Sequence, residues 1–302
     1  HILGLQANMF TEHTRSYARL QHNLFPRLAA VAETGWSPVA QRDFRDFLAR
    51  LPAQLQRYRA WGLAYAQTPF QVAVGQTDNR AANTVTVSLS NPLGYEVRYR
   101  TDGKPVTAQS PLYTTPLTEK LPASVQAAAF YQGQMLAAAP TVVDYSAQSL
   151  LSRRSQQLLS CVGEKGLVLR LEDDGPREGE RAVFNVDIFQ PCWRWADAQL
   201  AGISRIDVRA GRIPYYFQLA HDEPARKFEK ATRANGEMRI RRGDCSGPVL
   251  AEVPLPEKPD ADGFVTLHAT LPAGLTGTDD LCINFTGDTR PAMWVLDEAT
   301  LR

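Results

Sequence analysis

Residues 2–38, ILGLQANMFTEHTRSYARLQHNLFPRLAAVAETGWSP, decide how the amino-terminal part of the chain folds. The apolar run 2–6 is typical of a strand that is covered on both faces, as the strands of parallel sheets are. Residues 7–13 then place polar and aromatic side chains where that strand ends, which is the catalytic edge of a β/α barrel. Apolar side chains follow at helical spacing, at Leu20, Leu24, Leu28 and Val31. The stretch therefore predicts one strand–helix step of a larger β/α barrel.

Several short motifs in this stretch follow one another in order: GLQANMFTE at 4–12, FPRL at 25–28 and WSP at 36–38. Together they resemble the last strand and helix of the family-20 glycoside hydrolases, the β-N-acetylhexosaminidases. The resemblance continues as far as Gly62. It implies that only the eighth unit of an eight-stranded barrel is present, so that the chain is the carboxyl-terminal part of a longer protein. The upstream barrel of that protein is then its partner.

The resemblance also implies an exo-acting enzyme that hydrolyses terminal N-acetylglucosamine or N-acetylgalactosamine. In that family an adjacent Asp-Glu pair on an earlier strand does the chemistry. The Glu is the general acid, and the Asp positions the substrate's own acetamido oxygen, which attacks the anomeric carbon with retention of configuration. No segment here matches that strand. We therefore expect no catalytic residue in this chain and no activity from it alone. The alternative function is a non-catalytic carbohydrate-binding or structural accessory region.

Two residues of the first motif are candidate substrate-binding residues on the strength of the resemblance. Glu12 stands where the family has a carboxylate that accepts hydrogen bonds from the outer hydroxyls of the sugar. Phe10 stands where the family usually has a Trp that walls the pocket beneath the sugar ring, and a Phe keeps an apolar face but loses the indole N–H. The alternative for Glu12 is a structural acid stabilised by the dipole of the following helix.

Composition indicates a large globular piece. The chain has 302 residues, of which 44% are hydrophobic and 9% aromatic, enough for more than one packed core. A formal net charge of +1 gives no reason to expect a nucleic acid or an anionic membrane as partner. No apolar run is long enough to span a membrane. We expect carbohydrate, in the form of N-acetylhexosamine-containing glycans, to be the ligand, and we expect no cofactor.

The spacing of apolar residues changes twice along the chain. Helical periodicity from Val39 to Trp61 completes a first domain, 1–67, which is the last strand and helices of the truncated barrel. Short alternating runs then predict strands, and the phrase VRYRTDGKPVTAQSPLYTTPL resembles the small fibronectin-like β-sandwich that follows the barrel in chitobiases. This second domain spans 68–145. The fold class is thus α+β and multidomain, mostly β.

The third predicted domain, 146–302, has many short strands separated by Gly, Pro and Asp, a pattern typical of a jelly-roll-like β-sandwich. It weakly resembles the carbohydrate-binding modules that are appended to glycosidases. Such modules stack aromatic rings on sugars, so three tryptophans are possible sugar contacts, although sandwich cores use Trp as well. These are Trp193, Trp195 and Trp294. We expect no metal site; a structural calcium on Glu172, Asp173 and Asp297 is the open alternative.

All four cysteines of the chain lie in this third domain. An even count in one β-rich domain suggests disulfides and an oxidising compartment, so a periplasmic or secreted protein is expected. Cys245 follows the predicted strand 237–241, and Cys282 lies in the apolar run 281–285. Neighbouring sandwich strands bring such residues within bridging distance. We favour the pair Cys245–Cys282, although four cysteines allow three pairings and buried free thiols remain possible.

Overall fold

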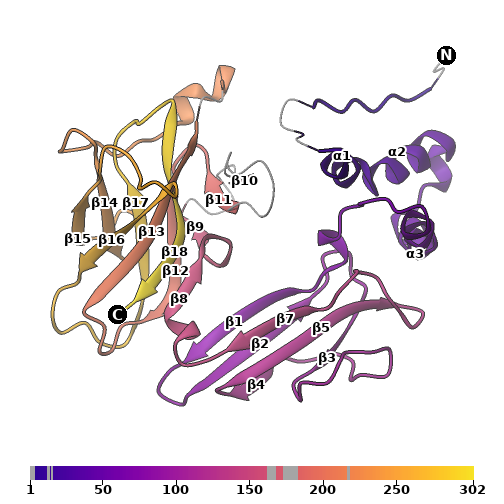
Figure 1. Ribbon diagram of the computed structural model, residues 1–302, viewed down its shortest axis with the longest axis horizontal. Coiled ribbons are helices and arrows are strands. Elements are labelled where there is room, and N and C mark those ends of the chain that lie inside the picture. The colour runs from indigo at the N-terminus through magenta and orange to yellow at the C-terminus, as the bar shows by residue number, and fades with distance from the viewer. Residues whose placement is uncertain (1–3, 12–13, 15, 162–167, 173–182, 216–217) are drawn as a thin grey trace. The chain divides into compact units, whose positions relative to one another are not determined.

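The computed structural model describes residues 4–11, 14, 16–161, 168–172, 183–215 and 218–302. The chain divides into two compact units, 1–147 and 148–302. Figure 1 shows that the α-helices labelled α1 to α3 belong to the first unit, whereas strands occur in both. The described chain is therefore mostly β with few helices, as predicted. None of the described helices has the length and apolar character needed to cross a membrane.

The helical segment of the first unit contains three α-helices and a short 3-10 turn. These are α1 (Tyr17–Leu24), α2 (Arg27–Trp36), η1 (Val39–Gln41) and α3 (Phe44–Ala60). Asp43 caps α3, because its carboxylate accepts hydrogen bonds from the backbone N–H groups of Arg45 and Asp46. Gly62, with φ of +67°, takes the left-handed conformation that ends helices. Polar capping and a glycine stop thus set the bounds of the longest helix.

Two local expectations differ from the structure. Residues 4–11, which include most of the predicted barrel strand, have no regular structure, since a strand needs neighbours to pair with and no described strand pairs with them. A serine followed by a proline, as at 37–38, also predicts the start of a helix. Ser37 instead ends α2, because its backbone N–H still bonds to the carbonyl of Glu33. Pro52 is expected to bend or divide its helix, and α3 is a single helix on both sides of it.

The β part of the first unit consists of two small antiparallel sheets. One has the order β1 (Ala73–Asn79), β2 (Thr84–Ser90) and β4 (Leu117–Lys120). In the other, β5 (Ala123–Tyr131) pairs with β3 (Glu96–Arg100), β6 (Gln134–Met135) and β7 (Thr141–Tyr145). The short turn η2 (Thr68–Phe70) leads into them. Val85 and Val87 are fully buried while their neighbours in β2 are not, which is the alternation of a strand with one covered face.

One hydrophobic cluster joins the helices to these sheets. It contains Leu51, Leu55 and Tyr58 of α3 together with Tyr95 and Ala129 from the β part. Each of these side chains is at most 9% exposed. The helical segment and the small sheets therefore share a core. The predicted boundary near residue 67 marks a change in the spacing of apolar residues. That it is also a domain boundary stays a prediction.

The second unit is built from two antiparallel sheets and a hairpin. The five-stranded sheet has the order β15 (Val249–Pro254), β14 (Glu237–Arg242), β17 (Thr278–Phe285), β12 (Cys192–Gln199) and β9 (Leu159–Ser160). The four-stranded sheet has the order β16 (Phe264–Thr270), β13 (Arg205–Pro214), β18 (Ala292–Leu301) and β8 (Ser152–Arg154). The remaining elements are β10 (Val168–Glu172), β11 (Val183–Asp187), η3 (Ser149–Leu151), η4 (Ser155–Gln157) and η6 (Ala220–Ala225).

A single core fills the space between the two sheets, so the second unit is a β-sandwich. Met238 and Ile240 of β14, and Ile206 and Val208 of β13, are completely buried in it. The alternating run 215–219 also predicts a strand, and for its described members this prediction is wrong, because β13 ends at Pro214 and residues 215, 218 and 219 belong to no strand.

Candidate functional site

The structure places only one of the two predicted sugar-pocket residues. The side chain of Phe10 is 76% exposed in the segment 4–11, so its ring face is open to a ligand or to another part of a protein. Glu12 lies outside the described residues. The sugar-pocket roles of both residues therefore stay predictions.

An apolar groove of about 770 Å³ lies between α2 and α3. Its walls carry the aromatic rings of Phe25, Phe47, Tyr58, Trp36 and Trp61. The last two rings are 89% and 65% exposed, although Trp is the side chain that gains most from leaving water. An exposed aromatic groove of this size marks a surface that another protein segment or a ligand covers.

An ion pair fixes the rim of this groove. Arg50 of α3 donates to both carboxylate oxygens of Glu33 in α2, at 3.1 and 2.7 Å, and its Nε donates to Asp46 at 3.0 Å. These bonds from Arg50 hold the pKa of Glu33 below its usual value. The bidentate pair joins α2 to α3 but adds little stability, because it is exposed to solvent.

The three tryptophans predicted as sugar contacts lie in the core of the second unit. Trp193, Trp195 and Trp294 are 2%, 3% and 3% exposed. The Nε1–H of Trp193 donates to the carbonyl of Asn185 at 2.8 Å, which satisfies its one polar atom inside the protein. None of the three rings presents a face to solvent, so the stacking role is not supported by this structure. They fill the sandwich, which was the alternative.

The structure has two disulfides, and one is the predicted pair. Cys245 is bonded to Cys282, and Cys161 is bonded to Cys192. Three of these sulfur atoms, those of Cys161, Cys192 and Cys245, lie within 4.8 Å of one another. A sulfur in a disulfide is no thiolate, so these atoms are not metal ligands in the oxidised protein.

The described residues give no support to a structural calcium site. Of its three candidate ligands, Asp173 lies outside the described part of the chain. Asp297 is paired with Arg209, which donates to its carboxylate, and with Arg154 at 3.8 Å. The arginine side chains thus occupy the position at this carboxylate that a calcium ion would take.

An extensive polar cluster of the second unit lies on the outer face of the five-stranded sheet. In β14 the apolar Met238 and Ile240 point into the core, so Glu237, Arg239 and Arg241 point outward. The register then places Asn284 of β17 directly opposite Arg239. Period-two alternation alone therefore gathers charged side chains on one face.

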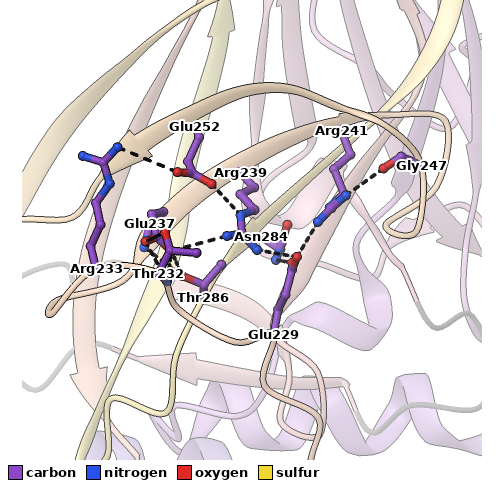
Figure 2. A network of polar contacts seen from close by, with 10 residues as sticks. All are labelled: Glu229, Thr232, Arg233, Glu237, Arg239, Arg241, Gly247, Glu252, Asn284 and Thr286. Atoms are coloured by element: carbon purple, nitrogen blue, oxygen red, sulfur yellow. Dashed lines mark hydrogen bonds and ion pairs between the residues drawn. The ribbon is translucent and has the colours of Figure 1, made fainter.

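Glu229, in the loop between η6 and β14, is the centre of this cluster (Figure 2). Its Oε1 accepts hydrogen bonds from Arg239 and Arg241, and its Oε2 accepts one from Asn284 at 2.7 Å. Arg239 also donates to Glu252 of β15 at 2.8 Å. Burial alone would raise the pKa of Glu229, but the bonds from Asn284 and the arginines outweigh it, and the pKa lies below its usual value.

A second carboxylate, Glu237, is completely buried beneath the same loop. It accepts hydrogen bonds from the backbone N–H and the hydroxyl of Thr232, at 2.9 and 2.6 Å, and from the hydroxyl of Thr286 at 2.5 Å. Burial would raise the pKa of Glu237, yet these bonds prevail and lower it. Gly236 lets the loop come this close, since a Cβ there would lie 2.5 Å from the carbonyl oxygen of Thr286.

The arrangement of this cluster suits anchoring and not reaction chemistry. Each carboxylate oxygen described above already accepts a bond from a protein donor, so none is free to move a proton. The net effect is to fasten the 229–237 loop to the sheet. Sequence reasoning did not find the cluster. The alternation in β14 was a usable signal for the arginines, but nothing in the sequence pointed to Glu229 as their partner.

Two family models match the first unit. Residues 1–39 match the model described as "Glycosyl hydrolase family 20, catalytic domain", and residues 76–140 match "Chitobiase/beta-hexosaminidase C-terminal domain". The matches come in the order that the sequence motifs predict. They confirm the resemblance to the carboxyl-terminal part of a family-20 hexosaminidase.

Two curated relatives carry the same kind of name. The chain is 34% identical over 121 residues to a β-hexosaminidase of Porphyromonas gingivalis, which is 39% of this chain and 15% of the relative. It is 32% identical over 68 residues to a β-N-acetylhexosaminidase of Cellulomonas fimi, which is 22% of this chain and 14% of the relative. The chain therefore aligns with only about one seventh of the length of these relatives.

Solved structures give fainter likenesses. A family 6 carbohydrate-binding module from Clostridium cellulolyticum, in complex with xylose, aligns at 14% identity and a TM-score of 0.33, covering 50% of this chain and 95% of that chain. A β-1,3-glucan-binding module of the same family from Bacillus halodurans gives 14% and 0.33, covering 50% of this chain and 94% of that chain. At these TM-scores the likeness carries no argument about fold or ligand.

Proposed function

Because matches to the end of a family-20 catalytic domain and to a hexosaminidase carboxyl-terminal domain follow one another in this chain, we propose that it is the carboxyl-terminal portion of an exo-acting β-N-acetylhexosaminidase. The longer protein, called the parent below, would hydrolyse terminal N-acetylglucosamine or N-acetylgalactosamine by substrate-assisted, retaining catalysis. The catalytic Asp-Glu pair lies outside this chain. The ordered pair of matches is the observation that carries the proposal.

In this proposal the chain contributes binding groups to the sugar pocket of the parent. The carboxylate of Glu12 accepts hydrogen bonds from outer hydroxyls of the sugar, and the ring of Phe10 forms part of the pocket wall. The exposure of Phe10 supports this role, since an apolar ring gains by being covered. A Phe in place of the family's usual Trp offers less area and no N–H, which favours a looser pocket.

The upstream barrel of the parent is the partner that we propose for the groove between α2 and α3. The exposed rings of Trp36 and Trp61 support it, because the helices of a β/α barrel pack against neighbouring helices and strands through such apolar faces. A hydrophobic surface of this kind is what a fold exposes when part of its own core is absent.

The alternative, a non-catalytic accessory region, has two observations of its own. In the second unit the candidate aromatic contacts are buried, and the carboxylates of the polar cluster in Figure 2 accept bonds from donors of the protein itself. Both features favour a structural role for this jelly-roll-like sandwich over a sugar-binding one. Two disulfides support the further proposal that the protein works in an oxidising compartment, either the periplasm or outside the cell.

The experiment that tests the proposal is the substitution Glu12→Gln in the parent. It keeps the size of the side chain but removes the charge, so kcat/KM for a chromogenic N-acetylglucosaminide should fall by roughly 10- to 150-fold, as loss of a charged hydrogen-bond partner predicts. Glu257→Gln, which alters an exposed acid of the second unit, is the matched control and should leave kcat/KM unchanged. Unchanged kinetics in Glu12→Gln with a lowered Tm would contradict the sugar role.

A further inference from the structure

A separate pocket of about 730 Å³ lies in the first unit, where the end of α3 faces the β5–β6 hairpin. Two of its lining side chains, Gln56 and Arg59, come from α3. Tyr65 and Gln67 come from the loop that follows the helix, and Gln134 comes from β6. This pocket shares no lining residue with the groove between α2 and α3. It also has no part in the function proposed above.

The floor of this pocket is held in place by the protein. Tyr65 is 3% exposed and belongs to the shared core, while its hydroxyl accepts a hydrogen bond of 2.8 Å from Nε of Arg59. Nη2 of Arg59 donates to the backbone carbonyl of Leu136. Oε1 of Gln67 accepts from the backbone N–H of Ala138 at 2.9 Å. The guanidinium is therefore positioned in advance, and no cost of ordering it remains for a ligand.

The charge of the pocket is unbalanced. Among the nine described residues that line it, one is a cation and none is a carboxylate. Arg59 donates to a phenol and to backbone carbonyls, all of them neutral, and within the described part of the chain none of these bonds uses its Nη1. A guanidinium that still has unused N–H groups binds an oxyanion more strongly than it binds a neutral ligand group.

The rest of the lining suits a ring that carries hydroxyl groups. The amides of Gln56 and Gln134 meet at the rim, where Nε2 of the first donates to Oε1 of the second. This leaves the carbonyl oxygen of Gln56 and the amino group of Gln134 for a ligand. Together these groups can accept a hydrogen bond from a hydroxyl and donate one to it. Met135 and Ala137 add an apolar side against which the face of a pyranose can lie.

We propose that this pocket binds an acidic sugar, that is, a pyranose bearing a carboxylate or a sulfate group. In this arrangement Arg59 pairs with the oxyanion, Gln56 and Gln134 bond to ring hydroxyls, and Tyr65 forms the floor. The site is contained within this chain.

Isothermal titration calorimetry on the 302-residue chain tests the proposal, with D-glucuronate, N-acetylglucosamine 6-sulfate, neutral N-acetylglucosamine and inorganic sulfate as titrants. We expect at least one acidic sugar to bind at least about tenfold more tightly than both the neutral sugar and sulfate alone. The two acidic arms distinguish carboxylate from sulfate. Arg59→Gln should abolish this preference. Arg57→Gln is the matched control, since Arg57 lies on the same helix but lines the other groove.

Because Arg59 also holds the hairpin, a second variant keeps the test decisive if Arg59→Gln unfolds. Gln134→Leu removes a rim amide that is exposed to solvent and should weaken the acidic sugar at least about fivefold while leaving the melting curve unchanged. Absence of binding by either acidic sugar at millimolar concentration would overturn the proposal. So would equal binding of sulfate alone, or an equal loss in Arg57→Gln. None of these results depends on hexosaminidase activity.

Discussion

The hydroxyl of Tyr95, just before β3, donates a hydrogen bond of 2.7 Å to the backbone carbonyl of Leu48 in α3. Its ring packs in the same cluster as Leu51 and Leu55 of that helix. One side chain thus ties α3, which follows the segment that matches a catalytic domain, to the sheets that match a carboxyl-terminal domain. Phe25, which lies inside the first matched segment, packs against the same cluster. The two matched parts are joined through a shared core as well as through the chain.

Replacing Tyr95 by Phe should destabilise the first unit. It removes the bond to Leu48 and leaves a buried carbonyl without that partner, which costs about 0.5–1.5 kcal/mol in the free energy of unfolding. Denaturant unfolding followed by circular dichroism measures this. Tyr99→Phe, on the surface of β3 where its ring meets Tyr113, is the control and should change stability by less. Equal effects of the two variants would show that the hydrogen bond contributes nothing.

The same tyrosine predicts a dependence on alkaline pH. Burial raises the pKa of Tyr95 to about 12, above the value of about 10 for an unfolded chain. The folded state therefore favours the protonated phenol, so its contribution is complete below pH 10 and is lost as the pH rises from 10 toward 12. Stability of the wild-type chain should fall more steeply over this range than that of Tyr95→Phe. Identical pH profiles would contradict the assignment.

Glu237→Gln should destabilise the second unit by about 1–3 kcal/mol, because it weakens buried, charge-assisted bonds from Thr232 and Thr286. The exposed Glu257→Gln is the matched control. Since the pKa of Glu237 is lowered in the folded state, its contribution is present above pH 4.3, roughly the unfolded value. It is lost as the pH falls below that. Unfolding measured between pH 7 and 3 should show the gap between wild type and variant closing with acid, and a constant gap would refute this.

Removing the disulfide between Cys245 and Cys282, by changing both residues to Ser, should lower the free energy of unfolding. The bridge joins residues 37 apart, and chain entropy predicts a loss of about 3–4 kcal/mol for a loop of this length. A peptide map under non-reducing conditions checks the pairing directly. Recovery of both residues as free thiols, or of Cys245 linked to Cys161 or Cys192, would contradict the structure.

Trp36→Glu should affect the stability of the isolated chain and of the parent differently. The side chain is 89% exposed here, so the isolated variant should keep its stability to within about 0.5 kcal/mol. In the parent, where we propose that the upstream barrel covers the groove, the buried charge should lower the Tm by several degrees. Leu112→Glu, an exposed apolar residue away from the groove, is the control for both. An unchanged Tm in the parent would mean that the groove is not covered.

Much of this fold could be predicted because its strands alternate clearly. The alternating run 84–89 predicts a strand, as does 237–241, and these residues form β2 and β14, since alternating apolar side chains fit one covered face. The run 2–6 forms no strand in its described part, residues 4–6, because no described strand pairs with it. Local sequence encodes a preference, and pairing decides whether it is realised.

The candidate sites were harder to predict than the strands. Trp193 and Trp294 are of the residue type that stacks on sugars. The direction of each side chain, however, depends on strand register, which one sequence does not fix. The pair Glu229 and Arg239 joins a loop to a strand, and no periodicity links them. Cys245 and Cys282 could be predicted because covalent chemistry leaves few choices.

The central claim is that this chain is a non-catalytic part of a β-N-acetylhexosaminidase, and the most direct test is turnover of a chromogenic N-acetyl-β-glucosaminide. The purified chain and the parent are assayed side by side at equal molar concentration. The account predicts that the parent hydrolyses the substrate, and that the chain alone is slower by a factor of at least about 10² to 10⁴, because the general acid is missing from it. Turnover by the chain alone at a rate comparable to the parent would contradict the account, as would an inactive parent.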